Sequence, residues 1–498
     1  MRKAALTKRE KMAANAVDKS FVRSQEPFGF HFSGNRSFDG EGKIQEWRAK
    51  LFTLYPNLLA NENKAGRYNK NENSNVKNMN MDIGGIRVFV RKRPMFTEKD
   101  QGVLSTETIK NYDTITTLDP FIFIHSEDER LGVKNGKLKS VPYRFHGTFH
   151  ENTTNNEIYK TTCQPLIKNI LDSNNFNVEN TIICYGQTGG GKTFTQMAMY
   201  ELGLLDIFKT KKEEQKLSIS FFENCGDRVF DLLNDRNEMK IQEDSEGNVI
   251  INGVKWRSCK TIEDALKVVR EGSQLRATHP TKNNPSSSRS HALCSFLLHG
   301  TNNKLTFVDL AGSERKKDVR EHSQERLAEM QQINWSLGTL KQCVRDLIEK
   351  KSVNPKKHVK FRNSKLTLLL KKIFVVNEEG DKSNRKSNFS VFIGCVSPLH
   401  TDKSHTDATI KYMEELMSVD IYLQNRVATI EELIRHLQLF YLEFYPSKAT
   451  RESVVSILNK FKGKEYNLYK GIKKKYRRAP KILLMSEGAI DRQKNNPL

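Results

Sequence analysis

The 498-residue chain lacks long apolar runs and a signal peptide. No run approaches 18 apolar residues, and the first ten residues, Met-Arg-Lys-Ala-Ala-Leu-Thr-Lys-Arg-Glu, lack the apolar core of a secretory signal. The sequence therefore predicts a soluble protein of the cytoplasm or nucleus, with no membrane as its partner.

Cysteine is scarce, and its pattern excludes two further classes. The seven cysteines are scattered, odd in number and without the spacing of a metal site. They predict reduced thiols in an intracellular protein, not a disulfide framework or a zinc site.

The heptad pattern of a coiled coil does not persist over three or four repeats, so a long coiled coil is not expected.

Acidic residues are too few to balance the basic ones. The chain has 82 Lys and Arg against 59 Asp and Glu, a formal net charge of +23. This surplus predicts a polyanionic partner, and nucleic acid or an acidic protein surface would satisfy it equally.

A complete phosphate-binding loop, Gly186-Gln-Thr-Gly-Gly-Gly-Lys-Thr193, follows the apolar run 181–185. The run is rich in strand formers and residues 193–200 can open a helix, so the predicted unit is strand, glycine loop, helix. Glycines let backbone N–H groups surround phosphate oxygens, and the helix N-terminus adds partial positive charge. The pattern predicts a nucleotide site in which Lys192 reaches the β- and γ-phosphates and the Thr193 hydroxyl binds Mg²⁺.

Two further segments carry groups suited to a metal-bound phosphate. An apolar strand over 304–309 ends in Asp309, and Leu310-Ala-Gly-Ser-Glu314 follows it. A strand-end Asp can hold Mg²⁺ through water, and the Gly after it lets the backbone approach and leave the γ-phosphate. Asn284-Pro-Ser-Ser-Ser-Arg-Ser-His291 gathers hydroxyls around one Arg, which suits a loop that closes over phosphate.

The three segments resemble parts of the kinesin motor domain. Residues 186–193 resemble its P-loop, residues 284–291 its switch I, and residues 304–314 its switch II. Further marks of the family are Arg91-Lys-Arg-Pro94, Ile333-Asn-Trp-Ser-Leu337, His358-Val-Lys-Phe-Arg-Asn-Ser-Lys-Leu-Thr367 and Ser390-Val-Phe-Ile-Gly-Cys-Val-Ser-Pro398. The resemblance covers about residues 83–420. It implies an α/β P-loop NTPase motor. From 83 to about 420 strands alternate with helical segments, which predicts a mostly parallel central sheet flanked by helices. The resemblance also implies ATP and Mg²⁺ as cofactors, microtubule-stimulated ATP hydrolysis, tubulin as the partner, and a place on cytoplasmic or spindle microtubules.

Within the family, the resemblance is greatest to kinesin-13, whose internal motors depolymerise microtubules. Three segments carry it: Val90-Arg-Lys-Arg-Pro94, Gly272-Ser-Gln-Leu-Arg-Ala-Thr278, and Lys43-Ile-Gln-Glu-Trp-Arg48 in a neck ahead of the motor. Two departures are present. The Lys-Val-Asp loop tip is absent from 127–140, and the family's Lys-Glu-Cys is here Lys341-Gln-Cys343. A translocating motor that carries cargo is therefore kept as the alternative to a depolymerase.

The chain is expected to have four parts. Residues 1–60 form a basic neck whose apolar stripe of Trp47, Leu51 and Leu54 should pack on the motor itself. Residues 61–82 are a low-complexity Asn/Lys-rich linker, 83–420 the motor domain, and 421–498 a helical basic tail in which Thr450 should cap a helix. Residues 462–478 carry eight Lys and Arg against one Glu, as a solvated face or a microtubule tether would.

The resemblance also assigns roles in the attack of water on the γ-phosphate. Lys192 is the phosphate cation, Ser287 and Asn284 line the γ-phosphate and its water, and Gly312 senses that phosphate through its N–H. Arg289 and Glu314 should pair when the two switches close. Thr193 and Ser288 are expected as direct Mg²⁺ ligands and Asp309 as a water-mediated one. The remaining nucleotide contacts are expected from Arg91, Arg93, Pro94, Gly186, Gln187, Thr188, Gly189, Gly190, Gly191 and Phe194, the last standing where the family has His.

Tubulin contact is expected from a basic cluster near the family's microtubule-facing loop, although an exposed helix face would also place lysines there. Its members are Lys341, Lys356, Lys357, His358, Lys360, Arg362, Lys365, Lys371 and Lys372. Trp335 replaces the family's Lys after Asn334.

A non-motor protein with a degenerate nucleotide site is disfavoured because the catalytic set is complete. A nucleic-acid motor would explain the charge but not the switch sequences, so no nucleic acid is expected as a partner.

Overall fold

The computed structural model describes residues 39–54, 85–95, 111–314, 324–423 and parts of 430–483. Short gaps at 131–132, 173, 213–214, 246, 279–288, 353, 355 and 375–387 interrupt these ranges. The expected linker 61–82 and most of the expected neck therefore lie outside the described residues.

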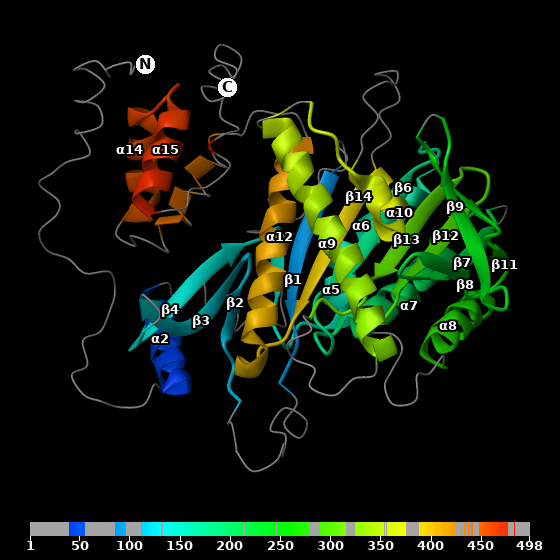
Figure 1. Cartoon of the computed structure of the whole chain (residues 1–498), viewed down its shortest axis with the longest axis horizontal. Helices are drawn as coiled ribbons and strands as arrows, with labels where there is room; N and C mark the ends of the chain where they lie inside the picture. The colour runs from blue at the N-terminus through cyan, green and yellow to red at the C-terminus, as the bar shows by residue number, and fades with distance from the viewer. Residues whose placement is uncertain are drawn as a thin grey trace, which may run out of the picture.

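An 11-stranded sheet forms the centre of the molecule (Figure 1). Its spatial order is β10 (Val249–Asn252), β9 (Asn237–Glu243), β8 (Arg228–Asp231), β7 (Leu217–Cys225), β12 (His291–Leu298), β13 (Asn303–Asp309), β6 (Glu179–Tyr185), β14 (Phe389–Val396), β1 (Gly85–Lys92) and β5 (Gly147–Phe149), and β11 (Arg257–Cys259) pairs with β7.

The sheet is mixed, whereas the sequence predicted a mostly parallel one. The pairs from β13 through β6, β14 and β1 to β5 are parallel, but the pairs from β10 through β13 are antiparallel. The reason lies in the connections. Only residues 299–302 join β12 to β13, with positive φ at Gly300 and Asn302. A connection this short permits only an antiparallel neighbour.

Helices cover both faces of the sheet. One face carries α5 (Asn155–Thr162), α6 (Gln164–Leu171), α7 (Lys192–Thr210) and α8 (Ile262–Thr278). The other carries α9 (Gln324–Ser352), α10 (Lys365–Leu369), α11 (Lys371–Phe374) and α12 (Lys403–Leu423).

Strand β6 is apolar over residues 182–185, where helices cover both of its faces. Ile182 and Cys184 point into the core under α5–α8, and Ile183 and Tyr185 point into the core under α9–α12. Successive strand residues face opposite sides, so a strand covered on both sides needs no polar face. The phosphate-binding loop leaves this strand at its carboxyl end.

The neck contributes a helix to the motor's own fold. Strands β2 (Ile115–Leu118), β3 (Phe121–Arg130) and β4 (Val133–Arg144) form a separate antiparallel sheet, and α2 (Gly40–Leu54) packs on β3 and β4 (Figure 1). The Trp47 ring lies 5.0 Å from that of Phe123 and 4.7 Å from that of His125. Trp47 thus contacts the motor as expected. The side chains of Leu51 and Leu54 lie outside the part of the chain that the structure describes.

The tail has a small core of its own. Helices α14 (Arg451–Lys460) and α15 (Glu465–Tyr476) bury Val454, Leu458, Leu468 and Ile472 together with apolar residues between 433 and 441. The Thr450 hydroxyl accepts a hydrogen bond from Ser453 N, which confirms the expected cap. Across the described part of the chain, no helix combines the length and apolarity that a membrane crossing needs.

Candidate functional site

The phosphate-binding loop has the backbone shape that its glycines predict. Gly186, Gly189 and Gly191 have φ of 150°, 77° and 96°, a region that residues with a side chain rarely adopt. Gly186 also lies against β14, where an added Cβ would come within 2.1 Å of Cys395 O. The loop can therefore turn its N–H groups toward a ligand only with glycine at these positions.

Lys192 is the buried cation of this loop. Its side chain begins α7, is 6% exposed, and donates from Nζ to Gln187 O at 2.9 Å. Burial lowers the pKa of Lys192, and the negative charges of Asp309 and Glu314 oppose that shift. A desolvated ammonium group held inside the loop suits an anionic ligand such as the phosphates of a nucleotide.

Thr193 and Asp309 meet at the end of β13. The Thr193 hydroxyl donates to Asp309 Oδ2 at 2.8 Å, and Arg276 donates to the same oxygen at 2.6 Å. The other carboxylate oxygen, Oδ1, is buried and has no hydrogen-bond partner among the described residues. Hydroxyl and carboxylate oxygens are ligands that Mg²⁺ prefers, so these groups fit the expected metal.

Arg276 was not assigned a role from the sequence. It lies on α8, is 4% exposed, and forms a buried ion pair with Asp309 while also donating to Ser290 O at 2.7 Å. The sequence offered only a weak signal, because Arg276 belongs to the quoted segment 272–278 but its partner comes 33 residues later. The pair joins α8, the residue before β12, and the end of β13.

Arg91 and Phe194 lie together on the expected base side of the pocket. Arg91 donates to Thr195 Oγ1 at 2.8 Å, and its guanidinium lies 5.2 Å from the centre of the Phe194 ring. Phe194 is 63% exposed, so its ring offers a flat surface for stacking. Arg93 is buried and donates to Pro94 O at 2.8 Å.

The start of switch II contacts the phosphate loop directly. Glu314 accepts hydrogen bonds from both the backbone N–H and the hydroxyl of Thr188. Gly312 lies at this contact, where an added Cβ would come within 2.3 Å of Thr188 Oγ1. Arg289 is half-buried, and its pairing with Glu314 stays a prediction for the closed state. Asn284, Ser287 and Ser288 lie outside the described residues.

His291 connects the ends of two strands to α9. Its Nδ1 accepts from Ala311 N at 3.1 Å, and its Nε2 lies 2.8 Å from Ser336 Oγ, which itself donates to Ile333 O. Burial, with the charges of Arg276 and Lys192, lowers the pKa of His291 to about 3. The ring is therefore neutral, with Nε2 as its donor, and ties the ends of β12 and β13 to α9.

The nine expected tubulin contacts separate into two groups. Five are exposed, namely Lys356, His358, Lys360, Arg362 and Lys372. Of these, Arg362 pairs with Glu243 and Lys372 pairs with Glu179. The other four are half-buried and engaged within the chain: Lys341 lies over the Tyr185 and Tyr412 rings, Lys357 pairs with Asp346 and Glu349, Lys365 reaches Ile241 O, and Lys371 pairs with Glu243.

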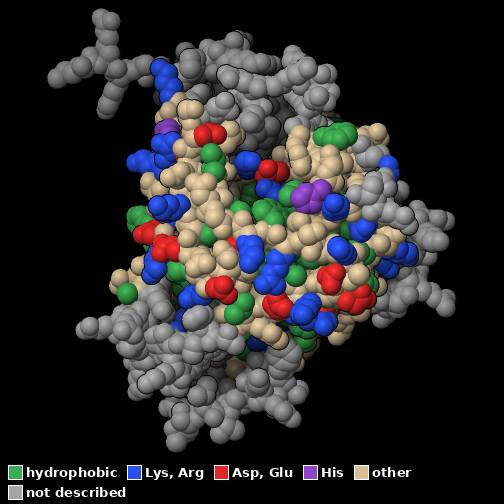
Figure 2. Space-filling view, turned by 90° about the vertical axis from the view of Figure 1, so that its right-hand side faces the viewer, with side chains coloured by type: hydrophobic (Ala, Val, Ile, Leu, Met, Phe, Trp, Pro, Cys, Tyr) green, Lys and Arg blue, Asp and Glu red, His purple; other side chains and the backbone are tan. Residues whose placement is uncertain are grey.

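Positive charge is compensated on other parts of the surface. Figure 2 shows the face at the end of the sheet that holds β8 and β11, where Lys and Arg are interspersed with Asp and Glu. Ion pairs there include Arg228 with Glu238 at 2.7 Å and Arg236 with Glu223 at 2.6 Å. On this face, the charges of Arg228 and Arg236 are therefore compensated by acids of the chain.

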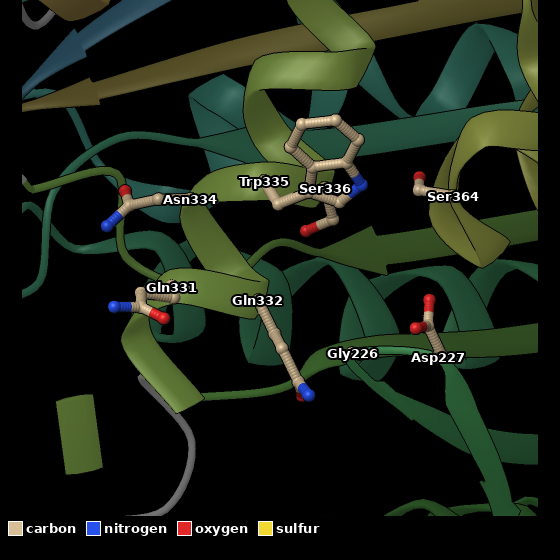
Figure 3. Close-up of a pocket in the computed structure, with 8 residues that line it drawn as sticks. All are labelled: Gly226, Asp227, Gln331, Gln332, Asn334, Trp335, Ser336 and Ser364. Carbon is tan, nitrogen blue, oxygen red and sulfur yellow. The ribbon is translucent and has the colours of Figure 1, made fainter. Parts of the chain in front are cut away.

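A cavity of about 490 Å³ lies between α9 and the turn after β7 (Figure 3). Gln331, Gln332 and Trp335 line it from α9, and Gly226 and Asp227 line it from the turn. Trp335 is 62% exposed and donates to Asn363 O at 3.3 Å. An exposed indole thus stands where the family's Lys would add a positive charge.

Comparisons with known proteins agree with this geometry. The kinesin motor domain family matches residues 91–419. Similar proteins include a diatom spindle kinesin-1 from Cylindrotheca fusiformis, 31% identical over 82% of this chain and 60% of its own length. The kinesin-like proteins KIF24 of Homo sapiens (33% identical, 66% of this chain, 23% of its own) and KIN-13B of Arabidopsis thaliana (29%, 68%, 48%) are also similar.

A solved structure of a fast kinesin has the same fold, with a TM-score of 0.54 and 23% identity over 68% of this chain and 92% of its own. The chain spans less than two thirds of the length of these three curated relatives, and their names belong to several kinds of kinesin. They show the motor domain but do not single out kinesin-13. The chain belongs to the kinesin motor-domain family, whose motor domains are microtubule-stimulated ATPases.

Proposed function

We propose that this chain is a Mg²⁺-dependent ATPase that binds microtubules and depolymerises them from their ends. The observation that carries the nucleotide part is the phosphate loop itself. Buried Lys192 lies inside a glycine cradle, and the Thr193 hydroxyl lies beside Asp309. The start of α7 and the end of β13 thus bring the phosphate cation and both proposed metal-binding oxygens together.

In this proposal, the chain's residues position and stabilise charge, as phosphoryl transfer requires. Bound Mg²⁺ supplies electrostatic neutralisation of the phosphates, with Thr193, Ser288 and Asp309 as its protein groups. Lys192 holds the β- and γ-phosphate oxygens. Ser287 and Asn284 line the γ-phosphate and its water, and Gly312 senses that phosphate through its N–H. Glu314 exchanges Thr188 for Arg289 when the switches close.

The exposed basic residues after α9 are the proposed tubulin contact. Lys356, His358, Lys360 and Arg362 are exposed in one short segment, and tubulin presents an acidic surface. Lys357 and Lys371 contribute less in this proposal, because they are half-buried and pair with acids of the chain. Arg362 shares Glu243 with Lys371 but is exposed, so it can still reach a partner.

Depolymerisation is supported by the neck and by one relative. Residues 43–48 resemble the kinesin-13 neck, and the similar protein KIN-13B carries that subfamily's number in its name. The missing Lys-Val-Asp tip favours the second candidate, a translocating motor that carries cargo. Trp47 and Arg48 dock this part of the neck on the motor, through Phe123 of β3 and Asp113.

Time-lapse imaging of stabilised, labelled microtubules with the full chain and ATP separates the two candidates. Shrinkage from both or either end supports the depolymerase, whereas gliding of filaments of constant length over immobilised protein contradicts it. The Lys192→Ala variant, which cannot use ATP, serves as the control for passive binding. Binding without either motion in ATP would contradict both candidates.

A further inference from the structure

Helix α15 has one buried face and one basic face. Leu468 and Ile472 are 5% and 4% exposed and point into the tail core. Lys470, Lys473 and Lys474 are exposed. At 3.6 residues per turn, these three lysines fall within an arc of about 100° on the side opposite the buried pair. The helix is thus held by its apolar stripe while it presents ammonium groups outward.

No exposed acid compensates this charge within residues 460–476. Glu465 is the one acid in that segment, is 9% exposed, and accepts from Gly463 N at 2.9 Å. Lys470 and Lys474 are four residues apart on one helix face, where like charges repel. The helix C-terminus favours lysines in its last turn, but Lys470 lies before that turn. The exposed lysines of the segment are Lys460, Lys462, Lys464, Lys470, Lys473, Lys474 and Lys475.

Tyrosine rings hold part of this face in place. The Lys470 ammonium lies 4.7 Å from the centre of the Tyr466 ring, and that of Lys473 lies 5.7 Å from the Tyr469 ring. Both pairs are spaced i, i+4 along the helix. A cation–π contact of this kind restricts a flexible lysine, so less conformational entropy is lost when an anion binds.

The tail core that holds α15 is packed on α9, close in sequence to the proposed tubulin contact. Ile348, near the end of α9, packs against the tail core. Helix α9 ends at Ser352, and the exposed Lys356, His358 and Lys360 follow it. A microtubule bound through those residues would therefore bring tubulin's acidic tails within reach of the tail unit.

We propose that the basic face of α15 is a second microtubule contact that binds the glutamate-rich, flexible tails of tubulin. This inference rests on the proposed microtubule binding of the motor. The lysines of α15 lie along one side of the helix, so a flexible acidic peptide can reach them in several conformations. Charge alone would fit nucleic acid equally well, and the attachment of the tail core to α9, next to the proposed tubulin contact, favours the tubulin tails.

The test compares two full-length variants with the same loss of charge. One carries Lys470→Gln, Lys473→Gln and Lys474→Gln. The matched control carries Lys209→Gln, Lys212→Gln and Lys216→Gln, which are exposed at and after the end of α7 on the opposite layer. Cosedimentation with ADP present gives Kd for intact microtubules and for microtubules whose acidic tails a protease has removed. Circular dichroism confirms that both variants fold, and basal ATPase should equal that of the unaltered chain.

The α15 variant should bind intact microtubules at least about fivefold more weakly, and the control less than about twofold. The difference should vanish on microtubules without tails and shrink in high salt. Equal weakening of the two variants, or a difference that persists without tubulin tails, would overturn the inference. A competition result would also overturn it: duplex DNA, but not a synthetic polyglutamate peptide, abolishes the difference in Kd between the unaltered chain and the α15 variant. If the unaltered chain fails to sediment at all, the proposed function itself is contradicted.

Discussion

At the residue scale, Lys192 is the group on which the phosphate site depends most. Lys192→Ala should lower microtubule-stimulated ATPase by about 10³-fold or more, because it removes the cation from a preorganised, desolvated loop. Lys209→Ala, at the exposed end of the same helix, is the matched control. A folded Lys192→Ala protein with near-normal turnover would show that another group holds the phosphates.

The buried pair of Arg276 and Asp309 makes a stability prediction. Arg276→Ala leaves the Asp309 carboxylate buried without its cation, which should cost about 3 kcal/mol of unfolding free energy. Urea unfolding of the single variant and of Arg276→Ala with Asp309→Asn measures this, because the double variant removes the stranded charge and should recover part of the loss. Equal losses in both variants would mean that packing, not charge, carries the effect.

Two buried histidines should make the protein acid-sensitive. Burial lowers the pKa of both His125 and His291 to about 3, against 6.5 in the unfolded chain. The unfolded state therefore takes up protons first, and stability is lost as pH falls below about 6.5, by about 2 kcal/mol per histidine between pH 7 and 5. Unfolding free energies of the full chain at pH 7 and 5 should show this slope, and His125→Gln should reduce it. His358→Gln removes an exposed histidine and should leave the slope unchanged.

At the element scale, α2 should behave as part of the motor. Trp47→Ala removes the ring that packs on Phe123 and His125, and should destabilise the motor by about 2 kcal/mol. Glu46→Ala, its exposed neighbour, should change the unfolding free energy by less than about 0.5 kcal/mol. Urea unfolding of both variants decides the matter, since equal stabilities would leave α2 a loosely attached segment.

Elements with strong local signals were predictable, and those set by distant partners were not. The unit of β6, glycine loop and α7 follows from residues 181–200 alone, because apolar strand, glycine turn and helix are each local. The mixed sheet was not predicted, because strands that alternate with helical segments favour parallel neighbours, whereas the short turn at 299–302 makes β12 and β13 antiparallel. Arg276 was missed because its role depends on Asp309, which only the fold brings beside it.

The ion network at the neck is a second case of this kind. Arg48 and buried Lys92 both contact Asp113 Oδ2, at 2.9 and 2.6 Å, and Lys92 lies between the two arginines of the expected base-side element. The sequence assigned Arg48 only to a neck motif. Three segments far apart in the chain make the contact, so no local pattern could reveal that Arg48 and Lys92 share Asp113.

At the scale of the whole molecule, the neck separates into two parts that truncation can tell apart. Residues 1–38 carry eight Lys and Arg against three Asp and Glu, whereas α2 within 40–54 is packed on the motor. Basic residues ahead of the motor can attract acidic tubulin tails over about 8 Å at physiological salt, which raises the association rate more than the strength of any one contact.

Removing residues 1–38 should therefore reduce the shrinkage of microtubule ends most at low protein concentration, and raised salt should reproduce part of that loss. Basal ATPase should stay unchanged, because every assigned catalytic residue lies beyond residue 90.

Removing residues 1–60 also deletes α2, so the docking of Trp47 and Arg48 is lost and both thermal stability and basal ATPase should fall. The measurement is shrinkage rate against concentration at two salt levels, with basal ATPase and Tm, for the full chain and both truncations. Identical shrinkage curves for the full chain and the shorter truncation would make residues 1–38 a passive extension. Unchanged Tm and ATPase in the longer truncation would show that the motor folds without α2.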